Sequence, residues 1–114
     1  MGAPAEGSVV LVRFPFSDLT ASKLRPAVVL AQVHHEDLIL CQVTSNPYAD
    51  PLAIEVSEDA FEKGSLQRTS YIRPDKLFTA NEALIEAEIA NLKGEIFNDI
   101  IDAIVGLLHA RRKQ

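Results

Sequence analysis

The sequence lacks the residues on which several common kinds of protein depend. Its one cysteine, Cys41, cannot form an internal disulfide, which fits a reducing cytoplasm. No apolar run approaches the ~18 residues that a membrane-spanning helix needs. The first residues have neither the basic start nor the apolar stretch of a secretion signal. We therefore expect a cytoplasmic protein that makes no membrane contact.

The usual motifs for metals, nucleotides and covalent catalysis are also missing. His34 and His35 are adjacent, so in an extended segment they point to opposite sides and do not chelate one ion. The chain has no HExxH motif, cysteine pair or acidic calcium loop. Its five glycines are scattered, and no Gly-x-Ser-x-Gly nucleophile elbow is present. We expect neither a metal nor a cofactor.

Charge is distributed unevenly along a chain whose length suits one domain. We expect residues 1–114 to form that domain, with 1–6 as a flexible extension. The net charge of −5 argues against a broadly basic nucleic-acid surface. However, six acidic residues and one base lie between Glu82 and Asp102, and the preceding part is closer to neutral. A local positive site on an acidic protein is compatible with this distribution.

Hydrophobic patterning predicts a mainly β structure that ends in a helix. Strands are predicted over 9–14, 26–32, 37–43, 53–56, 69–77 and, briefly, near 84–89. Residues 37–43 are apolar on both faces, which is typical of a central strand. Ser57 predicts a capped helical turn over 58–61. Several short strands and one closing helix predict an α+β domain with a small, strongly bent antiparallel sheet or barrel.

The closing helix, predicted over 95–112, has a broad apolar stripe. This stripe is wider than one sheet face needs. A homodimer interface and a deeply buried helix both explain its width, and the pattern does not separate them.

The most informative short motif is Arg25-Pro26, which stands before the apolar run Ala27–Leu30. Pro26 disfavours helix at the residue before it, so Arg25 is predicted at the junction of a loop and a strand. Thr44 and Ser45 follow the third predicted strand. A guanidinium and hydroxyl groups that converge on one point suit a phosphate diester. RNA supplies its own nucleophile, the 2′-hydroxyl, so such a site needs neither a metal nor a covalent side chain.

Three further residues are candidates for the same constellation. Ser17 and Asp18 belong to the predicted loop 15–25, and Arg73 to a later strand. A purely structural interpretation competes with this one: Arg25 would pair with Asp18 at the surface and Thr44 would cap a strand end. Composition alone favours the structural interpretation.

The order of the motifs changes that balance. Four segments stand in an order that is typical of one protein family: Gly7–Asp18, Arg25-Pro26, Cys41–Ser45 and Ser70–Leu77. In this order they resemble the MazF/PemK family of toxin endoribonucleases. The resemblance extends over nearly the whole chain. The resemblance implies an SH3-like barrel with a C-terminal helix. It also implies a homodimeric toxin of a type II toxin–antitoxin module that cleaves single-stranded RNA, usually mRNA, without a metal. Cleavage in this family leaves a 2′,3′-cyclic phosphate and a 5′-hydroxyl.

Site residues and partners follow from the same resemblance. Arg25 and Thr44 match the catalytic positions, and Ser17, Asp18, Ser45, Arg73 and Asp75 are expected to bind substrate. The expected partners are RNA, a cognate antitoxin with an acidic-hydrophobic C-terminal peptide and, together with that antitoxin, DNA. Phe16 and Tyr48 are candidates for stacking on a base.

Two alternatives remain open alongside the nuclease. One is a catalytically weak or inactive barrel that binds an antitoxin peptide, since the acidic charge balance is unusual for an RNA enzyme. Gly7-Ser8 also replaces the Gly-Asp that is usual in the family, a departure that we interpret as structural. The other is a toxin that binds a protein target such as gyrase. Those toxins typically end in exposed aromatic residues, whereas this chain ends in the polar segment 109–114.

Overall fold

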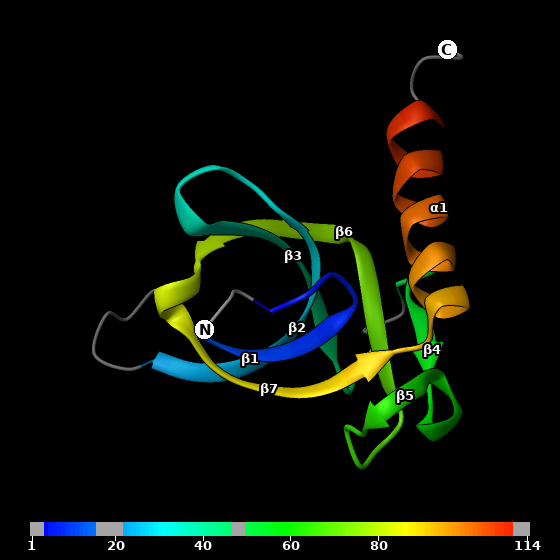
Figure 1. The fold of residues 1–114 in the computed structure, drawn as a ribbon. Helices are drawn as coiled ribbons and strands as arrows, with labels where there is room; N and C mark the ends of the chain where they lie inside the picture. Colours follow the sequence, from blue (N-terminus) through cyan, green and yellow to red (C-terminus); the bar gives the residue numbers. More distant parts are fainter. Residues whose placement is uncertain (1–3, 16–21, 47–49, 111–114) are drawn as a thin grey trace.

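A computed structural model describes residues 4–15, 22–46 and 50–110 (Figure 1). Within these residues the chain forms seven strands, three short 3₁₀ turns and one α-helix. The strands are β1 (Ser8–Pro15), β2 (Ser22–Gln32), β3 (Asp37–Thr44), β4 (Ile54–Val56), β5 (Phe61–Gly64), β6 (Ser70–Asn81) and β7 (Ile85–Leu92). The 3₁₀ turns are η1 (His34–Glu36), η2 (Glu58–Ala60) and η3 (Glu82–Leu84), and the helix is α1 (Gly94–Ala110). No helix among the described residues is long and apolar enough to cross a membrane.

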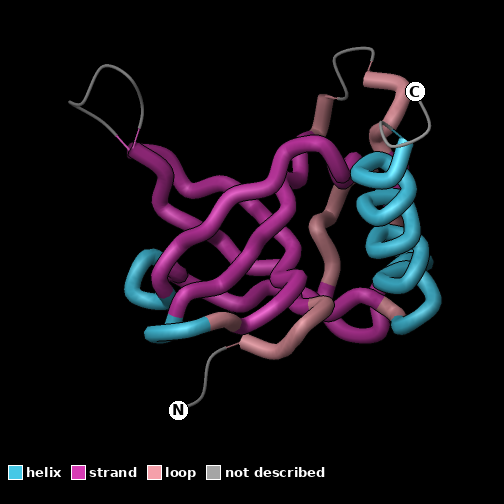
Figure 2. The backbone as a smooth tube through the Cα atoms, turned by 90° about the horizontal axis from the view of Figure 1, so that it is seen from above, coloured by secondary structure: helices cyan, strands magenta, loops and turns pink. Residues whose placement is uncertain are grey.

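All strand pairs are antiparallel, and the strand order is β4-β6-β3-β2-β1-β7-β5. The sheet curls into a half-barrel, and α1 stands along one side of it (Figures 1 and 2). The predicted fold class, a bent antiparallel sheet with a C-terminal helix, is confirmed.

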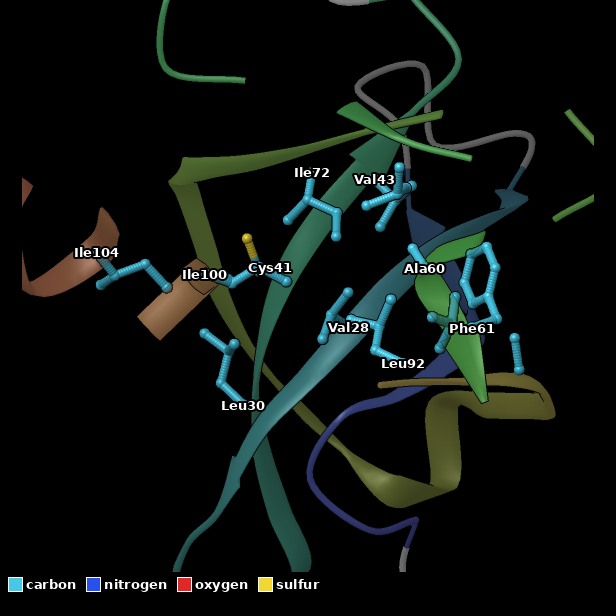
Figure 3. Close-up of a cluster of buried hydrophobic side chains, with 13 residues drawn as sticks. Val28, Leu30, Cys41, Val43, Ala60, Phe61, Ile72, Leu92, Ile100 and Ile104 are labelled. Carbon is cyan, nitrogen blue, oxygen red and sulfur yellow. The ribbon is translucent and has the colours of Figure 1, made fainter. Parts of the chain in front are cut away.

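Buried apolar side chains lie on both faces of the sheet, because successive apolar residues of the central strands point to opposite faces. The cluster on the helix side takes Cys41 and Val43 from β3 and Ile100 and Ile104 from α1 (Figure 3). The cluster on the opposite side takes alternate residues of the same central strands, namely Val10, Val12, Ala27, Val29, Leu38, Leu40 and Ala80. β3 contributes to both clusters and lies between β2 and β6, as its sequence predicted.

The helix is only partly covered by the sheet. Ile100 and Ile104 are buried, whereas Val105 is 44% exposed and Leu108 is 62% exposed. The helix was predicted over 95–112; it begins at Gly94 and the described part ends at Ala110. The broad apolar stripe therefore exceeds what this sheet buries.

Local structure differs from the sequence prediction around the middle of the chain. The predicted helical turn 58–61 is a 3₁₀ turn over 58–60, and Ser57 makes no side-chain cap; its backbone carbonyl accepts the N–H of Ala60 instead. The chain then enters β5, which was not predicted. Only Phe61 of this short strand is buried, and its other residues are exposed, so side-chain burial alone gives it little stability. Its backbone pairing with β7 supplies the rest.

A bulge interrupts the ladder between β3 and β6. Cys41 faces Leu77 and Val43 faces Ile72, so residues 73–76 stand opposite the single residue Gln42. Pro74 lies within this segment, where a missing N–H costs no ladder bond. The bulge accommodates Pro74 within β6, which continues to Asn81, past the end of the strand predicted over 69–77.

Candidate functional site

The register of β2 and β3 brings Arg25 and Thr44 together. Ala27 pairs with Gln42 across the two antiparallel strands, so Arg25 and Thr44 each lie two residues further towards the same end of the sheet. Steps of two keep a side chain on the same face. Arg25 and Thr44 therefore share one face at one end of the ladder.

A cavity of about 410 Å³ opens at this end of the sheet. Its lining combines strand ends with two loops: Lys23, Leu24, Arg25 and Pro26 from β2, Val43, Thr44, Ser45 and Asn46 from β3 and the residues after it, and Leu66, Arg68 and Ser70 from the β5–β6 connection and β6. Three of the predicted site residues, Arg25, Thr44 and Ser45, thus border one space.

The Thr44 hydroxyl also shapes the end of its own strand. Its Oγ1 donates to the carbonyl oxygen of Asn46 at 3.0 Å and accepts the N–H of Asn46 at 3.1 Å. These bonds form a turn at the rim of the cavity, and they are solvent-exposed. The structural role foreseen for Thr44 is therefore present, and the hydroxyl lines the cavity as well.

Sequence reasoning had not assigned two cations of the cavity, Lys23 and Arg68. Lys23 precedes Arg25 by two residues on β2, so strand alternation offered a signal for it. Arg68 lies in the loop 65–69, whose position depends on the pairing of β5 with β7. Together with Arg25 they place three cations around one cavity in a protein of net charge −5.

Arg73 and Asp75 do not line this cavity. The Arg73 Nε donates to Oδ2 of Asp50 at 3.0 Å, and both side chains are largely buried. The Leu52 N–H, and after it Arg73 and the neighbouring Asp75, hold the pKa of the Asp50 carboxyl below its ordinary value. The described structure thus gives Arg73 an internal partner, and the substrate-binding assignment of Arg73 and Asp75 stays a prediction.

The remaining predicted contacts belong to parts of the chain that the structure does not describe. Ser17 and Asp18 lie outside the described residues, as do Phe16 and Tyr48, the two candidates for base stacking. Their predicted roles therefore stay predictions.

The buried cysteine has a structural role. Cys41 Sγ donates to the carbonyl oxygen of Arg73 at 2.9 Å, at the bulge in β6. Burial, with a smaller contribution from the charge of Asp75, raises the pKa of Cys41 to about 12. A thiol with such a pKa is a poor nucleophile near neutral pH. Within the described ranges no three His, Cys, Asp or Glu side chains group in a way that could hold a metal ion.

The chemistry available at the cavity is anion binding and charge stabilisation. A guanidinium presents a planar fork to two oxygens of a phosphate. Hydroxyl groups at Thr44 and Ser45 add short donors from the neighbouring strand end. Guanidinium and hydroxyl groups of this kind bind phosphate oxygens and stabilise negative charge on them.

Comparison with known proteins gives a family and a fold. The sequence model described as PemK-like, MazF-like toxin of type II toxin-antitoxin system matches residues 5–108. Among curated proteins, none matches the sequence of this chain.

Several solved structures share the fold at low sequence identity. An endoribonuclease in complex with its cognate antitoxin from a mycobacterial species is 15% identical, with a TM-score of 0.73 over 93% of this chain and 95% of that one. A MazE–MazF structure (form II) from Deinococcus radiodurans is 17% identical, with a TM-score of 0.75 over 95% and 97%. MazF (form I) from the same organism is 18% identical, with a TM-score of 0.73 over 95% and 98%.

Proposed function

Because the chain belongs to the PemK-like, MazF-like toxin family of type II toxin–antitoxin systems, we propose that it is an endoribonuclease that cleaves single-stranded RNA without a metal ion. One observation carries the proposal: Arg25, Thr44 and Ser45, which come from two neighbouring strands, border a single cavity that is open to solvent. The endoribonucleases among the solved structures of this fold support the same activity.

In the proposed mechanism the RNA supplies the nucleophile. The 2′-hydroxyl loses its proton to water as its oxygen attacks the adjacent phosphorus, an O2′–P bond forms, and the P–O5′ bond breaks. The departing O5′ takes up a proton from water, so the products are a 2′,3′-cyclic phosphate and a 5′-hydroxyl. Arginine stays protonated in proteins, so we give Arg25 the role of stabilising the pentacoordinate phosphate rather than that of the base.

Thr44 and Ser45 act as hydroxyl donors in this scheme. Either hydroxyl donates to a non-bridging oxygen whose negative charge grows in the transition state. The Thr44 hydroxyl proton, now shared with the Asn46 carbonyl, turns towards the phosphate when RNA binds. The exchange costs little, because the carbonyl that it leaves is exposed and bonds to water.

Two protein partners are part of the proposal. A cognate antitoxin would bind through an acidic-hydrophobic peptide, because the cavity pairs its cations with the apolar side chains of Leu24 and Leu66. Displacement of that peptide by RNA would test the overlap of the two sites. The exposed Val105 and Leu108 on α1 support a homodimer, which sedimentation equilibrium would detect.

The activity is tested with purified, antitoxin-free protein and a long single-stranded RNA in the presence of EDTA. We expect discrete fragments whose ends are a 2′,3′-cyclic phosphate and a 5′-hydroxyl. A matched RNA with one 2′-deoxynucleotide before the cleaved linkage should resist cleavage at that linkage alone. Tight binding of an antitoxin peptide with no cleavage under these conditions would show a binding module instead.

A further inference from the structure

The cavity has more cationic groups than one phosphate requires. Arg25 stands with Thr44 and Ser45, whereas Arg68 comes from a separate loop and Lys23 from an earlier position on β2. We propose that Arg68 and Lys23 bind the phosphate next to the cleaved one, so that the loop 65–69 is an RNA-binding arm. This inference rests on the proposed ribonuclease function.

The loop holds the backbone of Arg68 in a fixed place. The hydroxyl of Ser70, a residue only 4% exposed, donates to the carbonyl oxygen of Arg68 at 3.2 Å. On the other side, the Gln67 N–H donates to Ser65 Oγ at 2.8 Å, and Gln67 adopts a φ of 65°. Leu66 packs against the helix-side cluster. Arg68 is thus anchored on both sides while its own side chain is exposed.

Lys23 and Arg68 differ in their ion pairing from two other cations of the described chain. Arg13 and Arg73 form ion pairs with Glu86 and Asp50. In the described part of the chain, by contrast, neither Lys23 nor Arg68 has a carboxylate within ion-pair distance. Two exposed cations at one rim repel each other, and a phosphate placed between them removes that repulsion.

The size of the cavity agrees with more than one bound group. Its volume of about 410 Å³ lies within the range typical of pockets for whole small molecules. Leu24 and Leu66 give it an apolar wall, and Asn46 a polar rim. The space therefore accommodates a nucleotide unit between two phosphates, with the base or sugar against the aliphatic side chains.

Arg68→Gln separates binding from chemistry. Because Arg68 contacts a phosphate that does not react, we expect KM to rise about tenfold while kcat stays unchanged, the pattern of a lost charge-assisted contact made equally in ground and transition states. The logarithmic salt dependence of RNA affinity should become shallower by about 0.7, the contribution of one phosphate contact to a single strand. Arg68→Lys keeps the charge and should restore most of the slope.

Lys93→Gln is the matched control, since it removes the same charge from an exposed residue that does not line the cavity. Affinity is measured with an uncleavable 2′-O-methyl RNA, so that binding is read separately from cleavage. The control should keep the wild-type KM and salt dependence. The same rise in KM and the same change in salt dependence in both variants would show that Arg68 acts only through net charge, and would overturn the inference.

Replacing single phosphate linkages of the RNA by neutral ones shows which phosphate Arg68 binds. The two linkages beside the cleaved one are replaced, one at a time, by a methylphosphonate that follows a 2′-O-methyl nucleotide. At one of the two positions we expect the substitution to weaken wild-type binding and to abolish the further effect of Arg68→Gln. An undiminished Arg68→Gln effect on both modified RNAs would contradict the assignment.

The experiments distinguish a failure of the second phosphate site from a failure of the proposed ribonuclease function. If the wild-type protein cleaves RNA, and Arg68→Gln keeps the wild-type KM and salt dependence of affinity, only the second phosphate site is overturned. Wild-type protein that neither binds nor cleaves RNA would overturn the ribonuclease and the inference with it.

Discussion

The Nε of Arg73 lies 3.0 Å from Oδ2 of Asp50, and this ion pair joins the loop that follows β3 to the bulge of β6. The Arg73 side chain is 17% exposed and that of Asp50 is 7% exposed, so water screens the pair less than a surface ion pair. The Leu52 N–H donates to the other carboxylate oxygen of Asp50 at 2.9 Å. One carboxylate thus fixes both the loop and the bulge.

We expect Asp50→Asn to lower the melting temperature at pH 7 and to have little effect in acid. The pKa of folded Asp50 is below its ordinary value of 3.8, so its carboxylate stabilises the fold above that pH. This stabilisation is lost as the pH falls through the lowered folded pKa. Thermal unfolding between pH 7 and pH 2.5 should therefore show the gap between wild type and variant closing in acid.

Asp59→Asn provides the control for charge, because Asp59 is exposed on η2. It should melt close to wild type throughout. A gap for Asp50→Asn that stays constant from neutral to acidic pH would mean that the ion pair contributes nothing measurable.

Gly64 and Gly106 should respond in opposite directions to alanine. Gly64 has a φ of +69°, and an added Cβ would stand 2.3 Å from the carbonyl oxygen of Ile89. We expect Gly64→Ala to lower the free energy of unfolding by at least about 1–2 kcal/mol, the cost of a left-handed backbone alone. Urea unfolding measures the change.

Gly106 lies within α1, and an added Cβ there meets nothing within 4 Å. Gly106→Ala should raise the free energy of unfolding by about 0.5–1 kcal/mol, because alanine loses less backbone entropy than glycine in a helix.

For the other glycine, equal stability of Gly64→Ala and wild type would contradict the close approach of β5 to β7.

Thr44→Val tests whether the hydroxyl acts on RNA. The substitution keeps the shape and removes the donor, so we expect a folded protein whose cleavage rate falls about 100-fold, as for one oxyanion donor. Loss of the two exposed bonds to Asn46 should cost no more than about 1 kcal/mol of stability. Thr44→Ser, which retains a hydroxyl, should keep most of the rate, and unchanged cleavage by Thr44→Val would leave Thr44 with its turn alone.

The sequence predicted those parts of the site that depend on local pattern. Arg25 and Thr44 come together because the alternation of β2 and β3, which can be read from their apolar residues, places both on one face. The junction of loop and strand predicted at Arg25 from Pro26 is wrong, because β2 begins earlier, at Ser22, and Arg25 pairs with Val12 inside the strand. The strand period was sufficient to place Arg25 and Thr44 on one face.

Other parts of the site depend on contacts between distant segments. Arg68 reaches the cavity because β5 pairs with β7, and β5 itself has one buried side chain, too weak a pattern to predict a strand. Asp50 and Arg73 are 23 residues apart and meet at a bulge whose register no short pattern specifies. From the sequence alone, therefore, Arg73 was interpreted as a substrate ligand, and its ion pair with Asp50 could not be predicted.

The most direct test of the proposed catalytic site is a single-turnover cleavage assay in EDTA with wild type, Arg25→Ala and Arg13→Ala side by side. Arg13 is the matched control, because its ion pair with Glu86 lies at the exposed surface and it does not line the cavity. Arg25→Ala should fold normally and lose roughly 100-fold or more in rate, while Arg13→Ala keeps the wild-type rate. Full activity in folded Arg25→Ala would contradict the assignment of this cavity as the ribonuclease site.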